Sequence, residues 1–374
     1  HRFAWTSTRR RRRVGAGAAE QTSMDDDLLD LAASAPAPHP RGPRDDADFA
    51  PRFDASAFAS DPAAAAIAFS DFIARRQPVV LTGCIDHWPA LESWTHDYLR
   101  TTLGDRLIHC ALTPDGLGDA VASSADGADC FVKPHEAQMP FGAFVDAIES
   151  PLRAPDGTIR HAVHYASHQN DSLSSEYEPL WADVDLALPW ADAAFGQPPA
   201  ATNFWMGEDA ARTTVHADLC DNVYCVVSGR KEFYLLPPQE GHLLRRRPYS
   251  AATYRPSADG QPHTLALELD APAADVLWSP VHLDDASSAS MRPVRASVGP
   301  GEVLFLPALW WHAVAQRGGE GSAPSTIAVN YWYEGPTALS EEVEAAAERS
   351  AARIFEQLKG TSARSPFPTF AVRT

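Results

Sequence analysis

The sequence predicts a mainly β fold, an antiparallel barrel or sandwich with helices before it and one helix after it. From Val163 onward, short segments rich in β-branched and aromatic residues are bounded by Gly, Pro and Ser, a pattern typical of antiparallel strands. Ahead of them, residues 63–77 (AAAAIAFSDFIARRQ) have a helical composition. Behind them, apolar residues of Thr337–Lys359 recur near one helical stripe.

The first 62 residues are expected to lie outside the compact domain. Residues 1–23 contain six arginines and a single acid, Glu20, so they are either a remnant of an organelle transit peptide or non-native sequence ahead of Met24. Residues 24–62 are rich in Ala, Pro and Asp without periodicity, which predicts a poorly ordered arm. The domain is therefore expected at residues 63–360, and residues 361–374 form a tail.

Each segment of that domain has its own pattern. Residues 78–90 (PVVLTGCIDHWPA) predict a buried strand that breaks into a turn. Residues 91–149 alternate short helical and extended pieces, with a helix expected at Met139–Glu149. Pro237–Met291 shows no regular pattern, which predicts an irregular insertion on a substrate-facing surface. The expected strands are VHYAS, NFWMG, NVYCVVSG, KEFYLLPP, VRASVGPGEVLFLPA, WWHAVAQ and TIAVNYWYE.

Composition and charge exclude several classes of protein. The chain has 31 Lys and Arg against 49 Asp and Glu, a net charge of −18, which argues against broad binding to nucleic acid or anionic membranes. No run approaches the roughly 18 apolar residues of a membrane helix. None of the five cysteines forms a CxxC pair, so a reducing compartment fits. We expect a cytoplasmic protein, with the nucleus and an organelle as open alternatives.

Two His-x-Asp pairs stand out as candidate metal ligands, His216–Asp218 and His282–Asp284. Residues two apart on an extended segment project to the same side, but chance alone gives about one such pair in a chain of this composition. Only the first pair is followed by strands and, much later, by a third candidate, His312 after Leu-Trp-Trp. Two His and one carboxylate on one face of an octahedral iron leave three positions open. The alternative for His216 is an ordinary hydrogen-bonded histidine.

Lys231 is the second unusual feature. It is in phase with Phe233 and Leu235 on an expected strand, so its side chain should point inward. A buried lysine costs several kcal/mol unless an anion meets it. Either an anionic cosubstrate binds there, or Lys231 lies at the rim with its ammonium in solvent.

Several collinear motifs carry a resemblance to a known family. They include TTVHADLCDN (213–222), HWPALESW (87–94), NFWMGED (203–209), DNVYCVVSG (221–229) and LPALWWH (306–312). Over about residues 65–360 the chain resembles the jumonji-C, cupin-like, 2-oxoglutarate oxygenases, which implies a double-stranded β-helix. It departs from the family at Ala217, where relatives commonly have Lys, and at Trp311, where they have Phe.

The resemblance implies a role for each site residue. His216, Asp218 and His312 would bind Fe(II), which uses 2-oxoglutarate and O2 as cosubstrates. Lys231 would pair with the distal carboxylate of 2-oxoglutarate. Thr213 and Tyr165 would be hydroxyl partners at the same carboxylate, and Asn222 and Asn330 would be the polar residues beside the metal and cosubstrate.

The resemblance also implies a reaction and a partner. One branch of the family is described as lysyl 3S-hydroxylases that act on developmentally regulated GTP-binding proteins, and endopeptidase activity has been claimed for it. We expect hydroxylation of a protein lysine, with succinate and CO2 as products. Asparaginyl or tRNA hydroxylation, peptidase activity and an inactive cupin binding module remain alternatives, although the charge disfavours a nucleic-acid substrate. The stripe in Thr337–Lys359 packs on the barrel or forms a homodimer interface.

Overall fold

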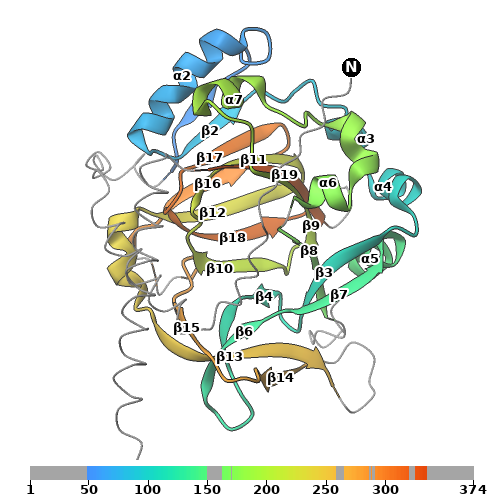
Figure 1. Ribbon diagram of the computed structural model, residues 1–374, viewed down its shortest axis with the longest axis vertical. Helices are drawn as coiled ribbons and strands as arrows, with labels where there is room; N and C mark the ends of the chain where they lie inside the picture. The colour runs from blue at the N-terminus through green and yellow to red at the C-terminus, as the bar shows by residue number, and fades with distance from the viewer. Residues whose placement is uncertain are drawn as a thin grey trace, which may run out of the picture.

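The computed structural model describes residues 49–149, 162–169, 171–257, 265–285, 288, 291–319 and 325–334. It confirms a mainly β fold: the described strands form one nine-stranded sheet and two five-stranded sheets (Figure 1). The helix expected at Thr337–Lys359 and the segment 1–48 lie outside the described residues.

The helices lie mostly in the first half of the described chain. The start of α2 is set by the Asp61 carboxylate, which accepts a hydrogen bond from the Ala64 N–H (3.1 Å), and by Pro62 at the first helical position. Among the described residues, no helix is long and apolar enough to cross a membrane. The helices are α2 (Pro62–Arg75), α3 (Ala90–Ser93), α4 (His96–Leu103), α5 (Phe141–Glu149), α6 (Ser172–Ser175), η1 (Glu178–Asp183), α7 (Pro189–Phe195) and η2 (Pro238–Leu244).

The central strands of the nine-stranded sheet are buried on both faces. Along β11, Val223 and Cys225 pack with the helices, whereas Tyr224 and Val226 pack toward the second sheet, as the period-two alternation of a strand requires. In Figure 1, α2 and α7 cover one end of this sheet. Its strands, in spatial order, are β1 (Arg52–Asp54), β2 (Val79–Thr82), β17 (Glu302–Leu306), β11 (Cys220–Ser228), β19 (Ser325–Glu334), β9 (Ala201–Glu208), β8 (Val163–Ala166), β3 (Leu107–Thr113) and β7 (His135–Pro140).

The second sheet faces the first and closes a sandwich around an aromatic and aliphatic interior. Phe233 on the second sheet packs edge-on against Tyr224 on the first, with ring centroids 5.2 Å apart. Apart from Asp218, which lies in the loop between β10 and β11, the proposed site residues lie on strands of these two sheets. The second sheet consists of β16 (Val294–Val298), β12 (Arg230–Leu236), β18 (Trp311–Arg317), β10 (Arg212–His216) and β4 (Leu117–Gly118).

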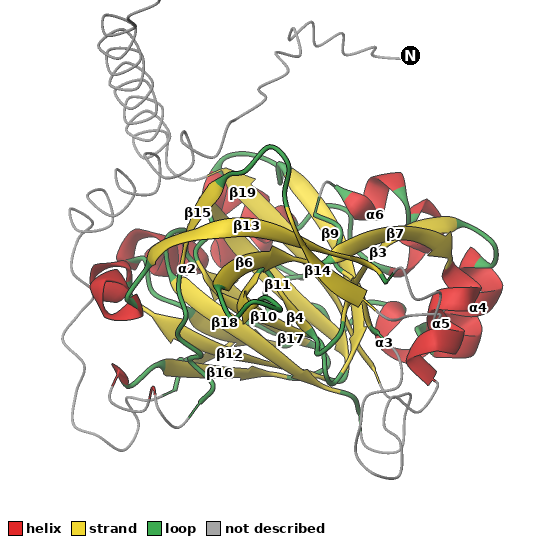
Figure 2. Ribbon diagram, turned by 90° about the horizontal axis from the view of Figure 1, so that it is seen from below, coloured by secondary structure: helices red, strands yellow, loops and turns green. Residues whose placement is uncertain are grey.

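The segment Pro237–Met291 is not the irregular insertion that its sequence predicts. It contributes three strands to a third sheet, which lies across one end of the sandwich in Figure 2. The prediction was wrong because the longest of these strands has the sequence RPYSAATYRP, in which Pro and Ala hide the usual strand pattern. The third sheet contains β14 (Leu265–Leu269), β13 (Arg247–Pro256), β6 (Asp129–Lys133), β5 (Ala120–Ser123) and β15 (Asp275–Trp278).

The ordered fold also begins earlier than residue 63. β1 pairs in parallel with β2, and the backbone N–H of Ala50 donates to the Arg295 carbonyl oxygen (2.8 Å). Phe58 is buried and packs against Trp190, with ring centroids 5.2 Å apart. Residues 49–62 therefore belong to the core, a contribution that a three-residue strand is too short to reveal in the sequence.

Candidate active site

The structure brings His216, Asp218 and His312 together at one end of the sandwich. His216 ends β10, and its cross-strand partner on β18 is His312. The Nε2 atoms of His216 and His312 lie 3.8 and 3.6 Å from the Asp218 carboxylate oxygens. The three ligand atoms all lie within 4.8 Å of one another, close enough to share one ion.

The protonation of both histidines suits metal binding. The Nδ1 atom of His216 lies 2.9 Å from the Thr214 carbonyl oxygen, and that of His312 lies 3.0 Å from the Trp310 carbonyl oxygen. A carbonyl only accepts, so each Nδ1 carries the hydrogen and each Nε2 presents a lone pair to the centre. Burial and the neighbouring His216 lower the pKa of His312 to about 4, although Asp218 opposes the shift. Two neutral imidazoles and a carboxylate fit a divalent transition metal.

A buried ion pair supports the two loops next to these ligands, residues 217–219 and 307–310. The Leu309 N–H donates to the Asp218 carbonyl oxygen (2.8 Å), which joins one loop to the other. Arg76 contacts both carboxylate oxygens of Asp221 (2.6 and 2.9 Å) and donates to the Ala308 carbonyl oxygen (3.1 Å). No local pattern predicts this pair, because Arg76 and Asp221 are far apart along the chain.

Removing Asp221 should therefore destabilise the fold. We expect Asp221→Ala to lower the free energy of unfolding by about 3 kcal/mol, because Arg76 is left without its partner at a mostly buried site. Urea unfolding measures this change. The matched control is Asp71→Ala, which removes an exposed pair with Arg75 and should cost less than about 1 kcal/mol. Equal losses in the two variants would contradict a supporting role for Asp221.

Lys231 lies inside the sandwich, as its strand phase predicts. Only 1% of its surface is exposed, and its Nζ donates to the Tyr165 hydroxyl (3.0 Å) and to the Gln316 side-chain oxygen. Burial lowers the pKa of Lys231 to about 7, and no acid of a described residue forms a salt bridge with it. Gln316 was missed in the sequence, although it lies two and four residues beyond inward-facing positions Val314 and His312 on the same strand.

Asn222 and Asn330, the two asparagines expected beside the metal and cosubstrate, belong to a chain of hydrogen bonds across three adjacent strands. Asn330 is fully buried, and its Nδ2 donates to the Asn222 side-chain oxygen (3.0 Å). The Asn330 Oδ1 accepts from the Trp205 indole N–H (2.8 Å) and from Asn203 (3.2 Å). Because every amide in this chain is paired, the strands are held in a fixed register beside the interior.

Comparison with known proteins now places the chain. A profile of the cupin-like domain matches residues 64–338. The chain is 35% identical over 269 residues to the human bifunctional peptidase and (3S)-lysyl hydroxylase JMJD7, an alignment that covers 71% of this chain and 80% of the relative. The chain belongs to the JmjC family. It is a 2-oxoglutarate-dependent dioxygenase, as the resemblance in the sequence implies.

Two further JmjC relatives cover a similar region. The lysine-specific demethylase JMJ32 of Arabidopsis thaliana is 36% identical over 278 residues, which is 71% of this chain and 77% of the relative. The JmjC domain-containing protein E of Dictyostelium discoideum is 31% identical over 286 residues, 71% of this chain and 80% of the relative. JmjC enzymes generally depend on Fe(II) and 2-oxoglutarate.

The second His-x-Asp pair of this JmjC chain lies elsewhere. His282 is exposed, and Asp284 accepts a hydrogen bond from Arg212 (3.2 Å). The described residues form two clusters of His and carboxylate side chains that could hold a metal ion, and neither His282 nor Asp284 belongs to either cluster. Context, rather than spacing, distinguished the two pairs.

A cavity of about 240 Å³ brings Tyr165 and Thr213 together with two acids, Asp119 and Glu136. Both side chains reach solvent, and desolvation at the cavity raises the pKa of both carboxyl groups. The Asp119 carbonyl oxygen accepts a hydrogen bond from the Thr214 hydroxyl, which places Asp119 beside the strand that carries His216. Sequence reasoning missed both acids.

A glycine lets the turn that carries Asp119 approach the sandwich. Gly116 has φ +89°, and a Cβ at this position would lie 1.8 Å from the Ala210 carbonyl oxygen. The Arg212 N–H donates to the Gly116 carbonyl oxygen (2.8 Å), so the turn is joined to β10. The close contact requires glycine, and it positions Asp119 at the cavity.

Proposed function

We propose that this JmjC enzyme binds Fe(II) through His216, Asp218 and His312 and hydroxylates a lysine of a protein substrate. The observation that carries the proposal is the pair of Nε2 lone pairs that face the Asp218 carboxylate. Bound iron and 2-oxoglutarate supply oxygen activation, with succinate and CO2 as products; the protein supplies binding, orientation and a dry site.

Lys231 is the proposed partner of the distal carboxylate of 2-oxoglutarate. Among the described residues the buried ammonium has only neutral partners, Tyr165 and Gln316, and such a group favours an incoming anion. Thr213, which lines the same cavity as Tyr165, is proposed as a hydroxyl partner, and Asn222 and Asn330 as the polar residues beside the metal and cosubstrate.

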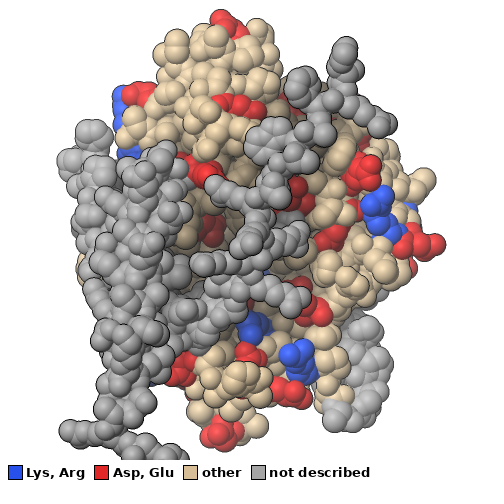
Figure 3. Space-filling view, viewed as in Figure 1, with Lys and Arg blue, Asp and Glu red and all other residues tan. Residues whose placement is uncertain are grey.

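A protein substrate with a cationic side chain suits the cavity. Asp119 and Glu136 place two carboxyl groups beside Tyr165 and Thr213, which favours a lysine ammonium over a neutral asparagine amide. On the face shown in Figure 3, the described Lys and Arg side chains form no continuous patch, and this supports a protein rather than a nucleic acid as substrate. A lysine of a GTP-binding protein is the proposed target.

Reconstitution with Fe(II) under anaerobic conditions, followed by O2 and 2-oxoglutarate, tests the proposal. The substrate is a lysine peptide from a developmentally regulated GTP-binding protein, and the control peptide carries norleucine at that lysine. We expect peptide-stimulated succinate formation and a lysine heavier by one oxygen atom. Succinate without a modified lysine would contradict the lysyl substrate, and no succinate from iron-loaded protein would favour a binding module.

Asp119 should contribute to recognition of the lysine. We expect Asp119→Asn to raise the KM for the lysine peptide by about tenfold, which corresponds to about 1.4 kcal/mol of lost charge pairing. Succinate formation without peptide should be unchanged. Asp115→Asn is the matched control, because Asp115 is exposed near Asp119 but is not among the residues that line the cavity. A KM equal to that of the wild type would remove Asp119 from the substrate site.

A further inference from the structure

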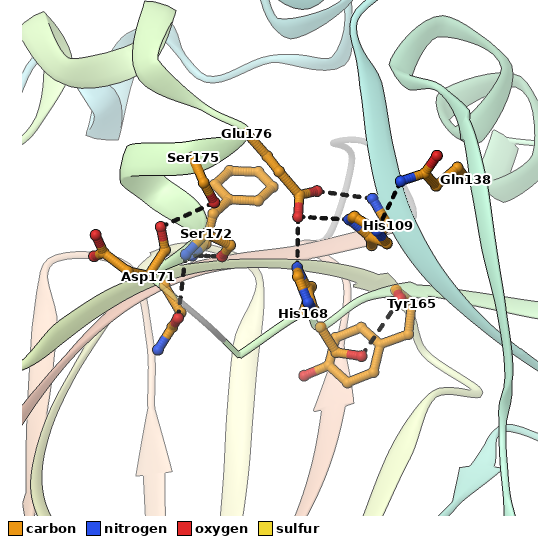
Figure 4. A network of polar contacts seen from close by, with 11 residues as sticks. His109, Gln138, Tyr165, His168, Asp171, Ser172, Ser175 and Glu176 are labelled. Atoms are coloured by element: carbon orange, nitrogen blue, oxygen red, sulfur yellow. Dashed lines mark hydrogen bonds and ion pairs between the residues drawn. The ribbon is translucent and has the colours of Figure 1, made fainter. Parts of the chain in front are cut away.

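A second cluster of two histidines and one carboxylate lies outside the site described above. His109 is on β3, His168 follows β8, and Glu176 follows α6. The Glu176 Oε1 lies 2.8 Å from the His109 Nδ1 and 2.5 Å from the His168 Nδ1. Figure 4 shows the Glu176 side chain reaching down from α6 to a point between the two imidazoles. Three separate segments thus aim ligand atoms at one point.

A backbone hydrogen bond and burial hold the Glu176 carboxylate of this cluster in place. Glu176 is 7% exposed, and its Oε2 accepts the His109 backbone N–H (2.7 Å). The two imidazole rings are half-buried and in contact, with centroids 4.3 Å apart. The protein therefore holds the ligand side chains on one side, while their other side is partly open to solvent. An ion could enter from that open side.

Gln138 adds an observation that concerns the protonation of His109. Its side-chain amide contacts the His109 Nε2 at 2.8 Å, and it is the cross-strand neighbour of His109 on β7. The two ends of a glutamine amide exchange by a simple flip. With its oxygen toward Nε2, Gln138 accepts the Nε2–H and leaves the Nδ1 lone pair directed at the centre, which is how outer partners orient a metal-bound histidine.

We propose that His109, His168 and Glu176 form a second metal site, which takes Zn²⁺. Two imidazoles and one carboxylate are a common zinc ligand set, in which a water molecule completes the tetrahedron. Ligands of a tetrahedral zinc lie about 3.3 Å apart for bonds of 2.0–2.1 Å, so the observed contacts must widen by less than about 1 Å.

A metal ion in this cluster would affect the enzyme, because the cluster lies beside the cavity. His168 lines the cavity that contains Tyr165 and Thr213. Zn²⁺ would fasten α6 to β3 and to the end of β8, and so hold one wall of that cavity in place. The inference does not depend on the proposed iron site or substrate, since it rests on different residues.

Zinc stoichiometry of the full-length, metal-free protein tests the proposal. Asp218→Ala removes a ligand from the other cluster, and this variant should still bind one Zn²⁺ per chain in calorimetric titration and elemental analysis. Adding His168→Ala should abolish that binding. His87→Ala, which removes a histidine paired with a single carboxylate (Asp185, 2.8 Å), is the matched control and should leave the stoichiometry at one.

Two outcomes would overturn the proposal. One is an Asp218→Ala protein that folds but binds no zinc; the other is zinc retained after His168→Ala is added. If circular dichroism shows that His168→Ala does not fold, His168→Asn, which keeps a hydrogen-bonding side chain, replaces it. Gln138→Leu provides a readout beyond occupancy: we expect about tenfold weaker zinc binding, and unchanged affinity would contradict the proposed orientation of His109.

Discussion

Replacing His216 with alanine is expected to abolish turnover. The variant keeps Asp218 and His312, but it loses one of two imidazole lone pairs that face the same point. Mutation of even the outer partners of metal ligands costs about 10–100-fold, so loss of a ligand should reduce the rate of succinate formation by more than about 100-fold. The rate at saturating 2-oxoglutarate, together with bound Fe(II) under anaerobic conditions, measures the effect.

The chain offers an internal control for this experiment. His282→Ala changes the exposed histidine of the other His-x-Asp pair and should leave both iron binding and succinate formation nearly unchanged. His216 is half-buried at the end of β10, so the thermal unfolding temperature should stay close to that of the wild type. Full iron content in a folded His216→Ala protein would contradict the assignment of the metal ligands.

The sequence was most informative where neighbouring residues share one strand. Lys231 is in phase with Phe233 on β12, so period-two geometry alone predicts the inward direction of its side chain. Asp218 lies two residues after His216 but beyond the end of β10, so strand geometry does not account for its direction. His312 needed more than period-two geometry: its place on a later expected strand made it a candidate third ligand, and the resemblance of LPALWWH to a family motif supported that choice.

The features that the sequence did not predict depend on contacts between distant segments. Arg76 meets Asp221 across 145 residues, and His109 meets Glu176 across 67. Asp119 lies at the cavity because Gly116 permits a turn to approach another loop. In each case the contact depends on how two distant elements pack together and not on the local pattern of either element. A single sequence therefore has no periodicity that reveals the contact.

Replacing Lys231 with methionine should make the protein more stable and inactive. Burial lowers the pKa of Lys231 from its ordinary 10.5 to about 7, which means that the fold disfavours the charged form. At 1.36 kcal/mol per pKa unit, the penalty at pH 7 is on the order of 4 kcal/mol. Methionine has a similar length and no charge, so we expect Lys231→Met to raise the free energy of unfolding by about 1–4 kcal/mol.

The pH dependence of this gain has a definite sign. A lysine whose pKa is lower in the fold than in the unfolded chain destabilises the fold below its unfolded pKa, and the penalty shrinks as pH rises from 7 toward 10.5. The advantage of Lys231→Met over the wild type should therefore fall by about 2 kcal/mol between pH 7 and pH 9. Urea unfolding at both values measures it, and Arg230→Met, at the exposed neighbouring position, should show no such trend.

Activity should change in the opposite direction. Lys231→Met removes the ammonium that is proposed to pair with the distal carboxylate of 2-oxoglutarate. Succinate formation should therefore require far more 2-oxoglutarate or cease. A stable variant that needs more cosubstrate would show that Lys231 is retained for binding at the expense of stability. A variant that is more stable and has unchanged dependence on 2-oxoglutarate would instead remove Lys231 from the cosubstrate site. Loss of stability at pH 7 would contradict the depressed pKa itself, because an uncharged side chain of this size should be favoured there.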